Sequence, residues 1–159
     1  MDEEFWRGVL GGVSLPTPLV LGQRGSGVGG SGVVRGVVGS EVVGRLEGVA
    51  RGLRVTMSSV VQAAWGLVLH RYCGLSDVVF GSVSLGRFAD VPGVERMVGL
   101  LMNTVPVRVR VDGGESVGEF LSGVHERLLA VREHEHSALV DVQRWAGAPA
   151  GTPLFDSIV

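Results

Sequence analysis

Residues 104–111, with the sequence TVPVRVRV, carry the clearest periodic signal in the chain. Valine recurs at every second position, and Thr104, Arg108 and Arg110 lie between the valines. A period of two places these two sets on opposite faces of a β-strand. Pro106 cannot donate a backbone hydrogen bond, so we expect a sheet edge or a bulge at this point.

The segments around this strand alternate between strand and helix signals. A second strand is predicted over residues 77–85, and a short one over residues 33–38. Helices are predicted over residues 2–10, from the N-cap Ser40 through Leu53, over 57–72, after the capping box Ser116/Glu119 through Val131, and over about 137–146. This alternation predicts an α/β or α+β fold in which a mixed sheet is covered by helices.

Two of these helices differ in their side-chain patterns. The helix that follows Ser40 has an apolar stripe on one side and glycines on the other, and each glycine costs about 1 kcal/mol relative to alanine. We therefore expect this helix to need tertiary packing. The stripe comprises Val42, Leu46, Val49 and Leu53. The helix of residues 57–72, capped by Thr56 and ended by Gly74, is apolar almost all round, which is typical of a core helix.

Composition narrows the class of protein. Hydrophobic residues make up 45% of the 159 residues and charged residues 19%, which is a globular composition. The net charge of −2, with all 14 basic residues arginine, does not indicate a nucleic-acid partner. Cys73 is the single cysteine, the acidic start differs from a secretory signal, and no apolar stretch is long enough to span a bilayer. We expect a cytoplasmic protein without a membrane partner.

Three local motifs invite functional interpretations that their context does not favour. Residues 25–30 match G-x-G-x-x-G, but a loop and a strand are predicted after them where a dinucleotide site needs a helix. Residues 81–86 miss the G-x-S-x-G spacing of a nucleophile elbow. His134 and His136 lie two residues apart, which on a helix points them to different sides, so we expect a polar helix end and no metal site.

Three stretches, read together and in order, resemble the condensation domains of nonribosomal peptide synthetases. Residues 78–95 contain VVFG, then Gly86-Arg87, then PGVE. Residues 97–108 match M-x-G-x-x-x-N-T-x-P-x-R. Residues 132–156 contain REHEH, Gln143 and the final TPLFD. The resemblance covers the whole chain except the glycine-rich loop of residues 25–32.

The resemblance implies a fold and a reaction. The fold is similar to that of chloramphenicol acetyltransferase, with two α/β halves. This chain, residues 1–159, would be the C-terminal subdomain, truncated at both ends. The reaction joins the amine of a carrier-bound acceptor to the thioester of a carrier-bound donor. It depends on an H-H-x-x-x-D-G motif that is absent from this sequence, so no catalytic residue is assigned here and the chain alone is expected to be inactive.

Four residues fall at matching motif positions, on segments that the resemblance places at the interface or the substrate tunnel. These are Arg87, Asn103, Thr104 and Arg108. We interpret Arg87 and Asn103 as organisers of the tunnel wall. The alternatives stay open that Asn103 caps a strand end and that Arg108 is an ordinary solvent-facing arginine. Leu85 and Phe88 depart from the residues common in the family, which leaves the detail of their loop unspecified.

The resemblance also implies the partners. They are the N-terminal half of the domain, peptidyl carrier proteins and the adenylation domain of the same synthetase. No cofactor is expected to bind directly, because the substrates arrive on carrier phosphopantetheine. Asn103-Thr104 favours a condensation domain over an epimerisation domain, and residues 132–136 favour an L-configured donor. Two alternatives are a non-catalytic recruitment module and a coenzyme A-dependent acyltransferase of the same fold.

Overall fold

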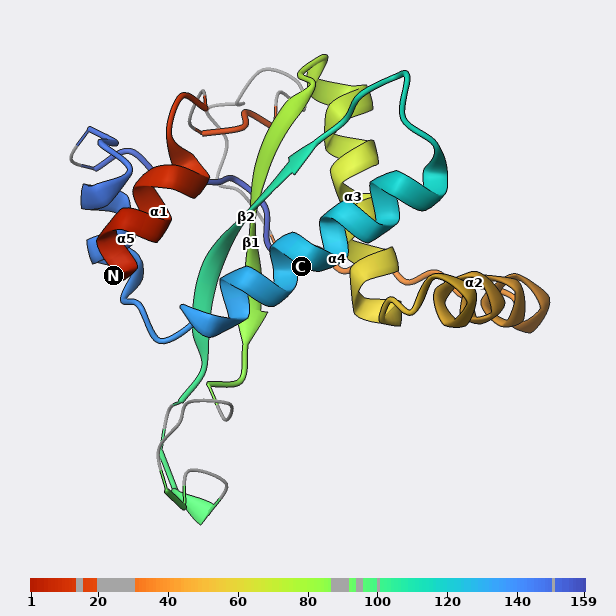
Figure 1. Ribbon diagram of the computed structural model, residues 1–159, viewed down its shortest axis with the longest axis horizontal. Helices are drawn as coiled ribbons and strands as arrows, with labels where there is room; N and C mark the ends of the chain where they lie inside the picture. Colours follow the sequence, from red (N-terminus) through yellow and green to blue (C-terminus); the bar gives the residue numbers. More distant parts are fainter. Residues whose placement is uncertain (14–15, 20–30, 87–91, 94–95, 100, 150) are drawn as a thin grey trace.

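The computed structural model describes residues 1–13, 16–19, 31–86, 92–93, 96–99, 101–149 and 151–159. Arg87 and the G-x-G-x-x-G stretch of residues 25–30 lie outside the described residues. In chain order the described elements are α1 (Asp2–Leu10), α2 (Ser40–Leu53), α3 (Met57–Cys73), β1 (Asp77–Ser84), β2 (Asn103–Arg110), α4 (Val117–Glu133) and α5 (Leu139–Trp145). Figure 1 shows α1 and α5 to the left of the two strands and α3 to the right, with α4 crossing in front of the strands.

The two strands form an antiparallel pair. Val78 lies opposite Val109 and Phe80 lies opposite Val107 in the register. A mixed sheet was predicted, but the assigned two-stranded sheet is antiparallel. Parallel pairing comes instead from the end of the chain, whose residues 157–159 bond to β1: the Gly81 amide donates to the Ser157 carbonyl at 2.8 Å, and the Val159 amide donates to the Gly81 carbonyl at 2.8 Å.

Buried apolar side chains form two clusters on this framework. The first cluster joins α3 and α4 to one face of the sheet through residues such as Ala63, Val78, Val109 and Val124. Gly66 permits this contact, since a Cβ there would lie 2.8 Å from a methyl carbon of Val109. The second cluster joins α1, α5 and the end of α4, and its members are Trp6, Leu10, Val79, Val105, Val131, Val142 and Leu154.

Most of the predicted helix boundaries are confirmed. The Thr56 hydroxyl accepts a hydrogen bond from the Ser59 amide at the start of α3, and Gly74 ends that helix with a left-handed φ of 68°. Ser116 and Glu119 form the predicted capping box of α4. The last helix is shorter than predicted, because α5 begins at Leu139. No single helix among the described residues is long and apolar enough to cross a membrane, and α2 and α3 pass that test only as a pair bent by 106°.

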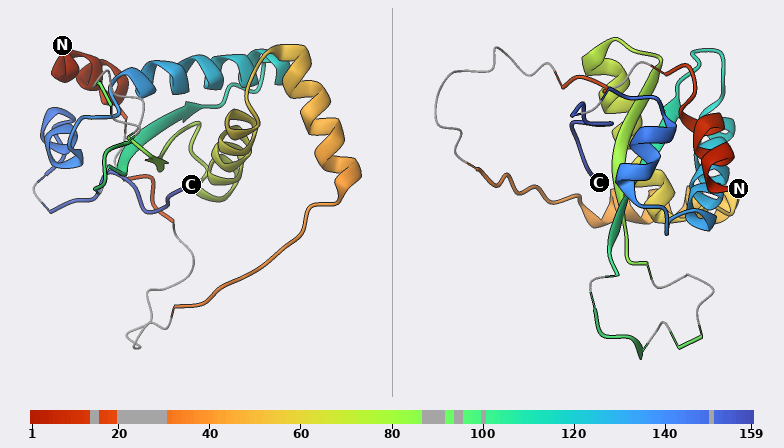
Figure 2. Two further views of the ribbon diagram at one scale, coloured as in Figure 1. Left: turned by 90° about the horizontal axis from the view of Figure 1, so that it is seen from below. Right: turned by 90° about the vertical axis from the view of Figure 1, so that its left-hand side faces the viewer.

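Two predictions about the region before α3 are wrong. Residues 33–38 were predicted to form a strand, but they carry no regular structure, and Val34 and Val37 are 99% and 98% exposed. A strand needs a neighbour to share its backbone hydrogen bonds, and none of the described residues pairs with this segment. Ser40 was predicted as an N-cap, but it is the first residue of α2, and Gly39 is the N-cap without a side-chain bond. Figure 2 shows residues 31–39 as an arm that runs apart from the body of the molecule.

The predicted apolar stripe of α2 is only partly covered. Val42, Leu46 and Val49 remain exposed, whereas Leu53 packs against the first cluster. The buried residue of this helix is Ala50. Figure 1 shows the reason, because α2 projects away from the sheet and meets the other helices at one end.

Candidate functional site

Asn103 joins the first residue of β2 to the turn that follows α4. Its amide nitrogen donates to the Glu135 carbonyl at 2.8 Å and to the Ser137 carbonyl at 2.7 Å. Its amide oxygen accepts a hydrogen bond from the Thr104 amide at 2.9 Å. The side chain therefore holds a turn that is more than thirty residues away in sequence, and it also caps the start of its own strand. The contact with the Thr104 amide agrees with a cap at the strand end, and the role of Asn103 in a tunnel wall stays a prediction.

Thr104 is placed beside the segment that ends the chain. It lies opposite Val83 in the strand register, and its methyl group is 3.0 Å from the position that a Cβ at Gly81 would take. The ring of Phe155 lies 2.6 Å from the same position. Thr104, Gly81 and Phe155 thus pack closely on one face of the sheet, and only a glycine leaves room between the other two.

Arg108 is buried, so the interpretation of this residue as an ordinary solvent-facing arginine is wrong. Its Nε donates to Asp77 Oδ1 at 2.8 Å, and its Nη2 donates to Asp77 Oδ2. Its Nη1 donates to the carbonyls of Val9 at 2.7 Å and Gly11 at 3.0 Å. A cation near the last carbonyls of a helix is favoured by the helix dipole, which explains why a charge is tolerated under α1.

The pKa of Asp77 follows from this arrangement. Partial burial alone would raise the pKa, but the hydrogen bonds and the positive charge of Arg108 outweigh burial. Arg110 adds a weaker attraction from 3.6 Å. The pKa of Asp77 is therefore held below its ordinary value, and the carboxylate stays charged beside its buried partner.

His134 and His136 converge on one carboxylate. His134 is the C-cap of α4, which confirms the polar helix end, but His136 lies in the turn beyond it. The expectation that the two rings point to different sides is wrong, because the chain has left the helix between them. His134 Nδ1 lies 2.6 Å from Asp2 Oδ1, and His136 Nε2 lies 3.2 Å from Asp2 Oδ2.

The contacts at Asp2 join the start of α1 to the end of α4. The Phe5 ring strengthens the junction by stacking on His134 with a centroid distance of 3.9 Å. The pKa of Asp2 is lowered, chiefly by the hydrogen bond with His134. No group of three or more His, Cys, Asp or Glu side chains is arranged to hold a metal ion within the part of the chain that the structure describes.

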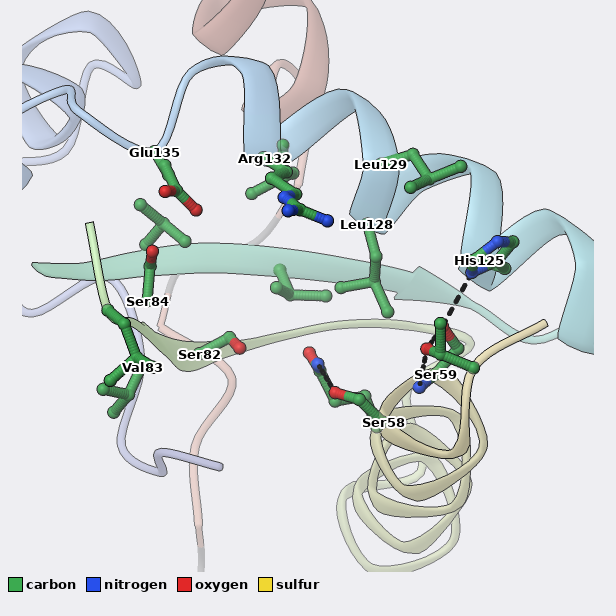
Figure 3. A pocket seen from close by; sticks show the side chains of 16 residues that line it. Ser58, Ser59, Ser82, Val83, Ser84, His125, Leu128, Leu129, Arg132 and Glu135 are labelled. Atoms are coloured by element: carbon green, nitrogen blue, oxygen red, sulfur yellow. Dashed lines mark hydrogen bonds between the residues drawn. The ribbon is translucent and has the colours of Figure 1, made fainter. Parts of the chain in front are cut away.

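A cavity of about 390 Å³ lies between α3, α4 and the two strands. Its apolar wall includes Val105, Val107, Leu128 and Leu129. Polar groups come from several elements, as Figure 3 shows: Ser58 and Ser59 from α3, Ser82 and Ser84 from β1, His125 and Arg132 from α4, and Glu135 from the turn after α4. A cavity with an apolar wall and a few convergent polar groups has the usual make-up of a small-molecule site.

One polar group in the cavity wall is locked by its neighbours. Ser59 Oγ lies 2.9 Å from His125 Nδ1 and 2.8 Å from Thr56 Oγ1. This serine is buried and already shares its hydroxyl between two partners, so its contacts tie α3 to α4. The pair is a structural link between the helices that flank the cavity.

Sequence reasoning missed the polar residues of this cavity. Ser82 and Ser84 share a face of β1 with Phe80, and Ser58, Ser59 and Gln62 form a polar group on a largely apolar helix, which is the signal that could have pointed to the cavity. Glu135 was considered as the middle residue of a histidine pair and as part of the stretch of residues 132–136, but it was not predicted as a site residue. Of the four predicted site residues, Asn103 is connected to the cavity through its bond to Glu135, whereas Arg108 serves the opposite face of the sheet.

Comparison with known proteins identifies the family of this chain. Residues 1–159 match the sequence profile of the family described as "Condensation domain". The chain belongs to the condensation-domain family. Chondramide synthase cmdD of Chondromyces crocatus is 48% identical over 158 residues, which are 99% of this chain and 4% of that protein. Bacitracin synthase 3 of Bacillus licheniformis is 37% identical over 141 residues, which are 87% of this chain and 2% of that protein.

Solved condensation domains share the fold of this chain. The first condensation domain of the calcium-dependent antibiotic synthetase superposes with a TM-score of 0.73 at 23% identity, over 98% of this chain and 34% of that one. The starter condensation domain of rhizomide synthetase gives a TM-score of 0.72 at 20% identity, over 99% of this chain and 34% of that one. A four-domain nonribosomal peptide synthetase gives 0.68 at 20% identity, over 74% of this chain and 9% of that one. This chain therefore spans about a third of a solved condensation domain and a small part of a synthetase.

Proposed function

We propose that this chain forms part of the C-terminal half of a condensation domain and supplies one wall of its substrate tunnel. The observation that carries the proposal is the family match across residues 1–159, a stretch whose sequence holds no H-H-x-x-x-D-G motif. The complete domain would join two substrates that are each held on a carrier protein by phosphopantetheine. The acceptor amine attacks the donor thioester, a carbon–nitrogen bond forms, the carbon–sulfur bond breaks, and the amine proton leaves with the released thiol.

We assign none of this chain's histidines to taking the proton of the amine. Its four histidines are His70, His125, His134 and His136, and no two of them are adjacent in the sequence. Each has a contact elsewhere: His70 with the Leu75 carbonyl, His125 with Ser59, and the other two with Asp2. The proposal therefore assigns proton transfer to the rest of the domain and assigns positioning to this chain.

Asn103 is the positioning residue that the contacts support best. It fixes the Glu135–Ser137 turn at one end of the cavity through two hydrogen bonds. Displacing a group by about 1 Å can lower a rate by about 10²-fold, so a residue of this kind can matter without touching the reacting atoms. Arg87 remains a second proposed organiser from the resemblance alone.

The test is a condensation assay with carrier-bound donor and acceptor. The chain alone is compared with a completed domain, made by placing this chain in the matching 158-residue stretch of chondramide synthase. We expect the bare chain to match the uncatalysed rate and the completed domain to form amide. Replacing the second histidine of the H-H-x-x-x-D-G motif in the completed domain should lower the rate much more than Asn103→Ala.

Two outcomes would overturn the proposal. Amide formation by the bare chain would place the reacting group among residues 1–159. A completed domain that folds but forms no amide would contradict the proposal that this chain supplies one wall of the substrate tunnel. A parallel reaction with an acyl-coenzyme A donor distinguishes a carrier-dependent domain from a coenzyme A-dependent acyltransferase.

A further inference from the structure

Two hydrogen-bond acceptors in the cavity have no donor among the described residues. Gln62 reaches the cavity from α3, and its Nε2 donates to Ser58 Oγ at 3.1 Å. Its Oε1 is buried and has no hydrogen-bond partner in the described part of the chain. Glu135 reaches the cavity from the turn after α4, and its Oε1 is equally buried and unpartnered there. Each of these two residues is 7% exposed.

Such atoms are rare in folded proteins for an energetic reason. A buried acceptor without a donor has lost its water and gained nothing in exchange, and the penalty is larger for a carboxylate than for an amide. The large majority of buried side-chain polar atoms in folded proteins have a hydrogen-bond partner. Two unpartnered oxygens that line the same cavity from different elements are accounted for together if the cavity receives a group that brings its own N–H donors.

The rest of the cavity limits what that group can be. The volume of about 390 Å³ and the valine and leucine wall fit a short apolar chain. Among the residues that the structure describes, the charged and titratable groups that face it besides Glu135 are Arg132 and His125. His125 is held by Ser59, and Arg132, which extends toward the cavity in Figure 3, has an interaction of its own. A charge-assisted bond to a carboxylate is about twice as strong as a neutral one, so the Glu135 end favours an ammonium over an amide.

The position of Glu135 does not depend on its own side chain. Asn103 fixes its backbone carbonyl at 2.8 Å, and its neighbour Ser137 is held by the same amide group. In Figure 3 the Glu135 carboxylate points across the cavity toward the strand that carries Ser84. The backbone of Glu135 is therefore set in place before any ligand arrives, which reduces the entropy lost on binding.

We propose that this cavity binds the side chain of a carrier-presented amino acid, and that this side chain is a short apolar chain ending in a primary ammonium. The inference rests on the proposed function for the identity of the molecule that carries the group. The binding chemistry itself rests on the buried, unpartnered carboxylate oxygen of Glu135. The ammonium donates to the free oxygen of Glu135, and its methylene groups lie against the valine and leucine wall.

The test measures binding with a matched pair of probes, n-butylammonium and n-butyltrimethylammonium. Both probes carry one positive charge and a four-carbon chain, but only the first has N–H donors. Binding is followed by NMR in the completed domain and, in parallel, in the 159-residue chain. We expect n-butylammonium to bind at least about tenfold more tightly than its trimethylated analogue, which corresponds to about one charge-assisted hydrogen bond.

Variants assign that difference to Glu135. Glu135→Gln keeps the shape of the side chain and should weaken n-butylammonium binding by about tenfold or more. Gln62→Met removes the free oxygen and should weaken it by a smaller factor. Glu133→Gln is the matched control, because Glu133 is an exposed carboxylate at the end of α4 and should leave binding unchanged. Asn103→Ala should also weaken binding, and Asn103→Asp should not restore it, because aspartate lacks the two N–H donors.

The comparison between the two probes needs no variant, so it holds even if a substitution prevents folding. Equal binding of both probes, or no binding of either in both proteins, would overturn the proposal. A loss of binding in Glu133→Gln equal to that in Glu135→Gln would also overturn it. If a completed domain forms amide but binds neither probe, the proposed ammonium site is refuted and the proposed function still stands.

Discussion

Replacing Arg108 by methionine tests whether one buried guanidinium anchors α1 to the sheet. The substitution keeps a long apolar stem and removes the donors that reach Asp77, Val9 and Gly11. Breaking a buried ion pair by removing one partner destabilises by about 3–5 kcal/mol. Asp77 is 30% exposed, so water recovers part of that energy when the arginine is gone. We expect a loss of about 3 kcal/mol in the free energy of unfolding.

The matched control is Arg110→Met on the same strand. The Arg110 side chain is 61% exposed, and its Nε approaches the same carboxylate only to 3.6 Å. An exposed pair of this kind contributes about 0–1 kcal/mol. Unfolding in urea is followed by tryptophan emission at two protein concentrations, so that association is separated from unfolding. Trp6, which is buried in α1, is one of the three tryptophans that report this transition. Equal losses in the two variants would refute the anchoring role.

Two further predictions concern acidity and the exposed helix. Asp2→Asn should make stability depend less on pH in the acid range. Because the pKa of Asp2 is lowered in the folded chain, its stabilising contacts are present above the ordinary pKa of about 3.9 and are lost as the pH falls below it. Melting temperatures between about pH 3 and pH 6 measure this, with Glu3→Gln as control, and an unchanged acid slope would contradict it. The 159-residue chain should self-associate through the exposed stripe Val42, Leu46 and Val49, and Leu46→Glu should reduce this in light scattering. A monodisperse unmutated chain at every concentration would count against that expectation.

Local signals predicted the elements whose causes lie within a few residues. The capping box of α4, the Thr56 cap and the Gly74 end of α3 are such cases, because the groups that bond are close in sequence. The period of two located β2 to within one residue at each end. By contrast, residues 33–38 have the composition of a strand but no strand neighbour among the described residues, and composition alone does not reveal that.

The candidate site was harder to predict because its contacts are distant in sequence. Arg108 alternates with valines as an outward-facing residue would, and only the position of α1, about a hundred residues earlier, buries it. His134 and His136 meet at Asp2 because α4 ends at the first of them. Gln62 and Glu135 line one cavity only because α3 and the turn after α4 lie on the same face of the sheet. The resemblance identified the family, but it could not identify this pair.

Helix α4 contributes to both hydrophobic clusters. Phe120, Leu121 and Val124 belong to the first cluster, and Val131 belongs to the second. If α4 leaves one cluster, the movement of the helix also pulls its other end out of the second cluster and exposes apolar surface there. The two clusters should therefore melt as one cooperative unit, and the amides in the middle of α4 should be among the slowest in the chain to exchange with deuterium.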